Sequence, residues 1–66
     1  MIHINLDLIM AKRGIGLMQL SRLVGITPAN LSRIKSGKAK QIRLNTLDTL
    51  CRVLNCEVKD ILEFVD

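Results

Sequence analysis

Positive charge is concentrated in the middle of this chain. Between Asp7 and Asp48 there is no acidic residue, and the interval holds eight lysines and arginines. The rest of the chain carries six carboxylates against two cations. Like charges this dense repel one another unless a polyanion neutralises them. The pattern therefore indicates nucleic-acid binding, with a solvated basic face that has no ligand as the alternative.

The other chemically active residue types form no catalytic or metal-binding pattern. His3 is the single histidine, and no cysteine, serine or carboxylate is arranged around it in sequence. Cys51 and Cys56 are five positions apart and fall on different faces of a helix, too few for a disulfide scaffold or a metal set. Gly14–Gly16 and Ser36–Lys38 lack the rest of a nucleotide-binding loop. We expect no enzymatic activity, cofactor, metal ion or disulfide.

Length and composition predict one small all-α domain over residues 1–66. Hydrophobic residues make up 48% of the chain, most of them Leu, Ile or Met, with a single aromatic residue. This is too apolar for a disordered chain, and such side chains keep rotamer freedom in helices. Charges interrupt every stretch long enough to cross a bilayer, and no signal peptide is evident. We expect a cytoplasmic protein that does not bind membranes.

The first residues predict a short strand followed by a helix. Ile2-His3-Ile4 alternates apolar and polar residues, which is the period of a strand, although three residues need a partner edge. From Asn5, which can cap a helix, apolar residues follow helical spacing as far as Gly14. The tail near Phe64-Val65 is the candidate partner for the strand.

Two short helices joined by a tight turn occupy the centre of the basic interval, over about residues 17–36. Gly25 ends the first, because glycine enters the left-handed conformation at low cost. Thr27 can cap the second with its hydroxyl, Pro28 fits its first turn, and it extends to about Ser36. So short a connection requires the two helices to cross at a steep angle. The pattern predicts a helix-turn-helix.

Two further helices are expected after a basic loop over residues 38–43. Asn45 can cap the fourth helix, with Asp48 placed to complete a capping box, and Asn55 can form its left-handed exit. Apolar residues at helical spacing predict a fifth helix over residues 58–64. The result is a bundle of about five short helices around one core, to which the fourth helix contributes Leu47, Leu50, Cys51 and Leu54.

These features together resemble the Cro/repressor (Xre-like) helix-turn-helix family, in particular a small stand-alone branch of it. The resemblance covers residues 15–62. It implies a lambda-repressor-like fold and a sequence-specific DNA-binding transcriptional regulator, with repression as the expected outcome. The matching features are Leu20-Ser21, Gly25, Thr27, Leu31-Ser32-Arg33-Ile34, Gly37-Lys38 and the ladder of Leu47, Leu50 and Leu54.

The resemblance places DNA base contacts on the helix that begins at Pro28. Pro28, Ala29, Asn30 and Arg33 match positions that family members direct at bases or at the adjoining backbone. An arginine such as Arg33 can donate two hydrogen bonds to guanine, and an asparagine such as Asn30 can pair with adenine. The alternatives are a phosphate contact for Arg33 and a second capping role for Asn30.

The remaining cations suit the phosphate backbone, which supplies most of the affinity for DNA. For Lys12 and Arg13, a DNA contact and simple solvation are equally open. The chain departs from the family at Leu17, where many members carry a DNA-contacting Gln, and at Lys35, where Glu is common. The expected DNA backbone contacts are Thr27, Lys35, Lys38, Lys40 and Arg43.

Double-stranded DNA and a second copy of the chain are the expected partners. One helix covers only a few base pairs, and two of them ~34 Å apart double the sequence that is recognised. The apolar segment 58–65 is the candidate dimer surface. The alternative is a protein-interaction module, such as an antitoxin, that binds an acidic protein with or without DNA. Separately, Leu17, Met18 and Leu23 either cover an additional partner surface or are singly exposed residues of no consequence.

Overall fold

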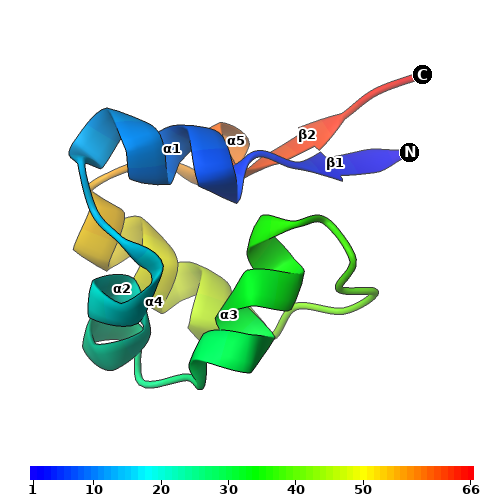
Figure 1. Ribbon diagram of the computed structural model, residues 1–66. Helices are drawn as coiled ribbons and strands as arrows, with labels where there is room; N and C mark the ends of the chain where they lie inside the picture. The colour runs from blue at the N-terminus through cyan, green and yellow to red at the C-terminus, as the bar shows by residue number, and fades with distance from the viewer.

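Five helices and two short strands make up the fold, and the computed structural model describes all residues from 1 to 66. Figure 1 shows α4 in the middle of the molecule, with α1 on one side of it and α2 on the other, while the two strands run outward with both termini at their tip. The longest helix has 11 residues, and none could span a bilayer. The elements are β1 (Ile2–Ile4), α1 (Leu6–Arg13), α2 (Leu17–Val24), α3 (Pro28–Lys35), α4 (Leu44–Leu54), α5 (Val58–Ile61) and β2 (Leu62–Phe64). The predicted bundle of five short helices with a minor terminal β pairing is confirmed.

One cluster of ten buried apolar side chains holds the helices together, and every helix contributes to it. Burying a leucine or isoleucine side chain contributes ~1.5–3 kcal/mol, so this cluster is the main source of stability. Cys51, expected in the core, is half-buried against it, and both cysteines are free thiols. The cluster consists of Leu6, Ile9, Met10, Leu20, Leu31, Ile34, Leu47, Leu50, Leu54 and Ile61.

The first helix has the predicted limits but lacks the predicted side-chain cap. Asn5 does not cap α1 with its side chain. Its backbone N–H donates to the Ile61 carbonyl at 2.7 Å, and its side-chain amide donates to Glu63 at 3.1 Å. Asn5 therefore ties the start of α1 to the end of the chain. Gly14 ends the helix in the left-handed conformation, as expected, with φ of 63°.

The capping box predicted for the fourth helix is wrong. α4 begins at Leu44, after Arg43 in an extended conformation, so Asn45 already lies inside the first turn and cannot cap. The Asp48 carboxylate instead accepts a hydrogen bond from Arg52 one turn later, at 2.9 Å. The predicted left-handed exit at Asn55 is confirmed, with φ of 50°.

The fifth helix is shorter than predicted, because the tail becomes a strand. α5 ends at Ile61, and Leu62 is already extended, with φ of −116° and ψ of 139°. β2 pairs antiparallel with β1, so that Ile2 lies opposite Phe64 and Ile4 opposite Leu62. The strand expected at the N-terminus thus finds its partner edge in the tail.

Candidate nucleic-acid interface

A buried serine and a left-handed glycine set the angle between α2 and α3. Gly25 has φ of 81°, and its N–H donates to the Ser21 carbonyl at 2.9 Å. The Ser21 hydroxyl donates to the carbonyl of Ile26, beyond the turn. Ser21 is 5% exposed and is the one buried polar residue of the molecule. Since a buried hydroxyl needs a partner, this bond holds the turn in one geometry.

Threonine and proline start α3 as the sequence predicted. The Thr27 side chain accepts a hydrogen bond from the Asn30 backbone N–H at 3.2 Å, and Pro28 occupies the first turn. Leu31 and Ile34 are buried and attach the helix to the core. The direction in which α3 faces solvent is therefore decided by these two apolar side chains.

The side chains expected to contact bases lie on the outer side of α3. Ala29, Asn30 and Arg33 are exposed, and Pro28 is half-buried at the start of the helix. Positions 29, 30 and 33 fall on one helical stripe, because three or four residues complete a turn. The structure therefore presents an amide and a guanidinium together at the surface, beside a methyl group.

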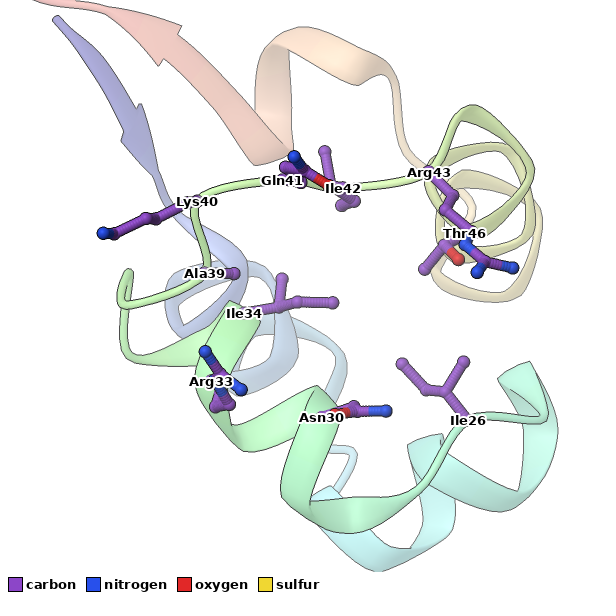
Figure 2. A pocket seen from close by; sticks show the side chains of 10 residues that line it. All are labelled: Ile26, Asn30, Arg33, Ile34, Ala39, Lys40, Gln41, Ile42, Arg43 and Thr46. Carbon is purple, nitrogen blue, oxygen red and sulfur yellow. The ribbon is translucent and has the colours of Figure 1, made fainter.

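A groove of about 530 Å³ separates α3 from the segment that leads into α4. Figure 2 shows Asn30 and Arg33 on its α3 side and Arg43 above Thr46 on the other, while the Lys40 side chain extends away from it. Polar and basic side chains line the groove around an apolar floor, and it contains no carboxylate. The floor consists of Ile26, Ile34, Ala39 and Ile42.

Two residues that were not predicted to belong to the site, Gln41 and Thr46, also line this groove. Gln41 lies within the predicted basic loop, between Lys40 and Arg43, and that position is the only signal of its role. Thr46 directly follows Asn45, the predicted cap, so the sequence indicates only that it lies at the start of the fourth helix. Thr46 lies in the first turn of α4, and this turn contributes it to the groove wall.

The cations around α3 have no carboxylate partner. The two ion pairs of the structure, Arg52 with Asp48 and Lys59 with Glu57, both involve cations outside the basic interval. Unpaired, hydrated cations on one surface create a positive potential that attracts phosphate. The exposed cations on and after α3 are Arg33, Lys35, Lys38, Lys40 and Arg43.

Arg13 is a structural residue rather than part of this surface. Its Nε donates to the Leu54 carbonyl at 2.7 Å, and its Nη2 donates to the Asn55 carbonyl at 3.1 Å. These carbonyls lie at the end of α4, where a helix has no internal donors left. The neighbouring Lys12 is exposed and makes no such contact.

Leu17 occupies the position where many members of the Cro/repressor family carry a glutamine. Its side chain is half-buried and packs against the core. Met18 and Leu23 are exposed on the same helix. The start of α2 therefore offers no polar side chain at position 17, and any anchor on the DNA backbone there must come from another residue.

Comparison with known proteins agrees with this geometry. Residues 5–66 match the family model described as the Cro/C1-type HTH DNA-binding domain, a range that includes all five helices and the whole surface around α3. The chain is also 54% identical over 63 residues to YozG of Bacillus subtilis (strain 168), described as an uncharacterized HTH-type transcriptional regulator. That alignment covers 96% of this chain and 75% of YozG. The resemblance noted in the sequence is confirmed, and the chain belongs to the family of Cro/C1-type helix-turn-helix DNA-binding domains.

Proposed function

We propose that this protein is a sequence-specific transcriptional regulator that inserts α3 into the major groove of double-stranded DNA. The observation that carries the proposal is the outer surface of α3, where Asn30 and Arg33 are exposed beside cations that have no carboxylate partner. The major groove is ~12 Å wide and admits one helix. Family membership and the name of the relative YozG support the same function.

In this proposal four residues recognise bases. Arg33 donates two hydrogen bonds to guanine O6 and N7, and Asn30 pairs with the N6 and N7 groups of adenine. Ala29 and Pro28, at the leading end of the helix, lie against a thymine methyl group. The free backbone N–H of Ala29 at this end, together with the Thr27 hydroxyl, donates to a phosphate.

The DNA backbone contacts lie on the C-terminal side of α3. Lys35 and Lys38 flank the end of the helix, and Lys40 and Arg43 lie along the segment that borders the groove. One phosphate strand follows this segment, and the apolar floor of the groove faces its sugars. Such contacts position the protein and make the affinity depend on salt.

We further propose that the protein binds as a homodimer and represses transcription. Two helices related by a twofold axis recognise enough base pairs to select a site. Occupation of promoter DNA excludes other proteins by itself, so repression requires no catalytic activity. Action on DNA implies a location in the bacterial cytoplasm or nucleoid.

Selection of bound fragments from random duplex DNA at two salt concentrations tests the proposal. A twofold-symmetric motif with half-sites about one helical turn apart is expected. Arg33→Ala is expected to weaken binding by ~1–3 kcal/mol and to remove the preference at one base position. If it instead weakens all sequences equally, Arg33 contacts phosphate and its assignment to a base is wrong.

The backbone contacts are tested by the slope of affinity against salt. Lys38→Ala is expected to reduce that slope by about one unit. Lys59→Ala is the matched control, because Lys59 is an exposed cation outside the basic interval that pairs with Glu57. If the wild-type protein does not bind duplex DNA even at low salt, the basic surface serves an acidic protein partner instead.

A further inference from the structure

The end of α4 brings the two cysteines of this chain together. Their spacing of five would place Cys51 and Cys56 on different faces of a continuous helix, which is the arrangement expected above. α4 instead ends at Leu54, and Asn55 adopts the left-handed conformation, with φ of 50° and ψ of 55°. The chain turns back at this residue, so Cys56 returns to the last turns of the helix, where Cys51 lies.

Backbone hydrogen bonds define the turn. The Cys56 N–H donates to the Cys51 carbonyl at 3.0 Å, and the Asn55 N–H donates to the Arg52 carbonyl at 3.3 Å. These two bonds form the Schellman motif, in which the side chains of the residues joined by the outer bond frequently pack together. That contact is usually apolar, whereas in this chain both side chains carry a thiol.

Arg13 holds the same turn from α1. Its guanidinium donates to the Leu54 carbonyl at 2.7 Å and to the Asn55 carbonyl at 3.1 Å. Both cysteines are half-buried and pack against the core, and both are free thiols. The core and Arg13 therefore fix the turn from two sides, and the two thiols stay close together while a small molecule can still reach them.

The electrostatics of the thiols agree with this contact. Burial raises the pKa of the Cys56 thiol, and the interaction with Cys51 raises it further. Cys56 therefore keeps its proton at neutral pH. Because the thiolate is the nucleophile, Cys51 is the thiol that attacks an oxidant first.

We propose that Cys51 and Cys56 are a reversible redox pair, which a small peroxide converts into an intramolecular disulfide. In the first step the Cys51 sulfur attacks one peroxide oxygen, so that an S–O bond forms and the O–O bond breaks. The other oxygen leaves with the Cys51 proton. In the second step the Cys56 sulfur attacks the Cys51 sulfenic acid, and the S–O bond breaks as the S–S bond forms. Hydroxide leaves and takes the Cys56 proton as water, and the peroxide has gained the two electrons that the sulfurs lost.

The pair gives the protein a reversible response to oxidation. A sulfenic acid without a neighbouring thiol proceeds to sulfinic acid, which thiols do not reduce, whereas a disulfide is reversed by thiol exchange. In a reducing compartment the pair is a dithiol except during exposure to an oxidant.

The redox pair lies away from the proposed DNA-binding surface. Neither cysteine lines the groove beside α3. Figure 1 shows the end of α4 on the side of the molecule away from the loop that follows α3. We therefore expect oxidation to leave the surface around α3 unchanged, and the inference does not depend on the function proposed above.

The disulfide is expected to stabilise the fold. It closes a loop over residues 51–56 and so removes conformations from the unfolded chain. The thermodynamic cycle then requires the folded chain to favour the disulfide over the dithiol more strongly than the unfolded chain does, by the same factor. In the chain-entropy model this factor is at least ~10-fold for so short a loop.

Oxidation of the full chain with hydrogen peroxide tests whether the bond forms. The folded protein is expected to lose two hydrogen atoms in intact mass and to run as a single chain on a denaturing, non-reducing gel. Trypsin cleaves after Arg43, Arg52 and Lys59, so the oxidised protein should yield peptides 44–52 and 53–59 joined by the disulfide. Dithiothreitol should separate them.

Equilibration with reduced and oxidised glutathione measures how strongly the fold favours the bond. The equilibrium constant for the intramolecular disulfide is expected to be at least ~10-fold higher in buffer than in concentrated urea. The double variant Cys51→Ser with Arg52→Cys is the matched control. Its loop is shorter by one residue, but the Arg52 side chain is 78% exposed and pairs with Asp48. Its equilibrium constant should be no higher in buffer than in urea.

Cys56→Ser removes the second thiol, and peroxide is expected to convert Cys51 in this variant to sulfinic acid. Circular dichroism verifies that each variant remains helical. In the wild-type protein, sulfinic acid or a disulfide between two chains as the main product overturns the inference. An equilibrium constant that is no higher in buffer than in urea overturns it as well. Failure to bind DNA contradicts only the proposed function.

Discussion

At the scale of single residues, the cations of this protein divide into those that stabilise the fold and those that remain available to a ligand. Arg13 belongs to the first group, since it donates to the last carbonyls of α4. Arg33 and Lys38 belong to the second, since both are exposed and neither is in an ion pair. The sequence shows their common charge but not this division, because the carbonyl partners of Arg13 lie about forty residues away.

Arg13→Ala is therefore expected to destabilise the protein. It leaves the Leu54 and Asn55 carbonyls without a donor, and loss of hydrogen bonds to a charged group lowers the free energy of unfolding by ~1–3 kcal/mol. Urea denaturation measures the change. Lys12→Ala, which removes an exposed cation with no such contact, should stay within ~0.5 kcal/mol. Equal losses in both variants would contradict the structural role of Arg13.

The cysteines provide a second test at this scale. Burial raises the pKa of the Cys56 thiol, and the neighbouring Cys51 raises it further. Less thiolate is present at mildly alkaline pH, so iodoacetamide should modify Cys56 in the folded protein more slowly than in urea. The folded protein favours the protonated Cys56 thiol, because the pKa of this thiol is raised on folding. The contribution of the thiol to the free energy of unfolding is therefore complete below the pKa that Cys56 has in the unfolded chain. The contribution is lost as pH rises through the folded pKa. Faster modification of the folded protein would contradict this environment.

At the scale of the elements, the helix ends follow from local backbone preferences. Gly14, Gly25 and Asn55 all adopt positive φ at the positions where the sequence predicted helices to stop. Thr27 and Pro28 likewise start α3 as predicted. These residues act on their nearest neighbours, so the sequence alone is sufficient to place them.

Gly25→Ala tests the turn between α2 and α3. At φ of 81° an alanine is strained by ~1–2 kcal/mol, although no atom lies within 4 Å of the added Cβ. Thermal or urea denaturation should show that loss. Gly16→Ala is the control, because Gly16 has φ of −88° and equally open surroundings. Its effect is expected to be smaller, ~0.5–1 kcal/mol, because Gly16 is the N-cap of α2, where glycine is preferred to alanine. A loss at Gly16 as large as that at Gly25 would exclude backbone strain as the cause.

The elements that the sequence analysis misplaced depend on distant contacts. Leu62 is spaced as a helical residue, yet its backbone is extended because β1 provides a partner strand from the other end of the chain. Asn5, a good local capping residue, instead bonds to Ile61 and Glu63. Both wrong predictions concern residues where the two ends of the chain contact each other, and no local sequence pattern indicates that contact.

At the scale of the whole molecule, one small core supports every element. A protein of this length is expected to have a free energy of unfolding of ~3–10 kcal/mol. The core brings together one to three residues from each helix, so the orientation of α3 depends on the same side chains as overall stability. Leu31 and Ile34 connect the proposed DNA-binding surface to that core.

Leu50→Ala tests this dependence. Leu50 is fully buried in α4, and removing such a side chain from a core costs ~2–5 kcal/mol. We expect most of the stability to be lost, with cooperative unfolding of helices and sheet together in circular dichroism. Leu44→Ala removes the same atoms from a residue that is 82% exposed and should change little. A folded, stable Leu50→Ala protein would show that the helices do not share one core.

The amino-acid sequence by itself was sufficient for the fold class, the helix-turn-helix, most helix ends and the identity of the basic surface. These depend on spacing, capping and charge, which act over a few residues. The base and phosphate contacts of Asn30, Arg33 and their neighbours stay predictions, now with exposed side chains that are free to make them. Only the tertiary structure separated Arg13 from the other cations, formed the groove beside α3 and joined the chain ends into a sheet. Each of these results joins residues far apart in sequence, and such contacts are decided by the packing of the whole core.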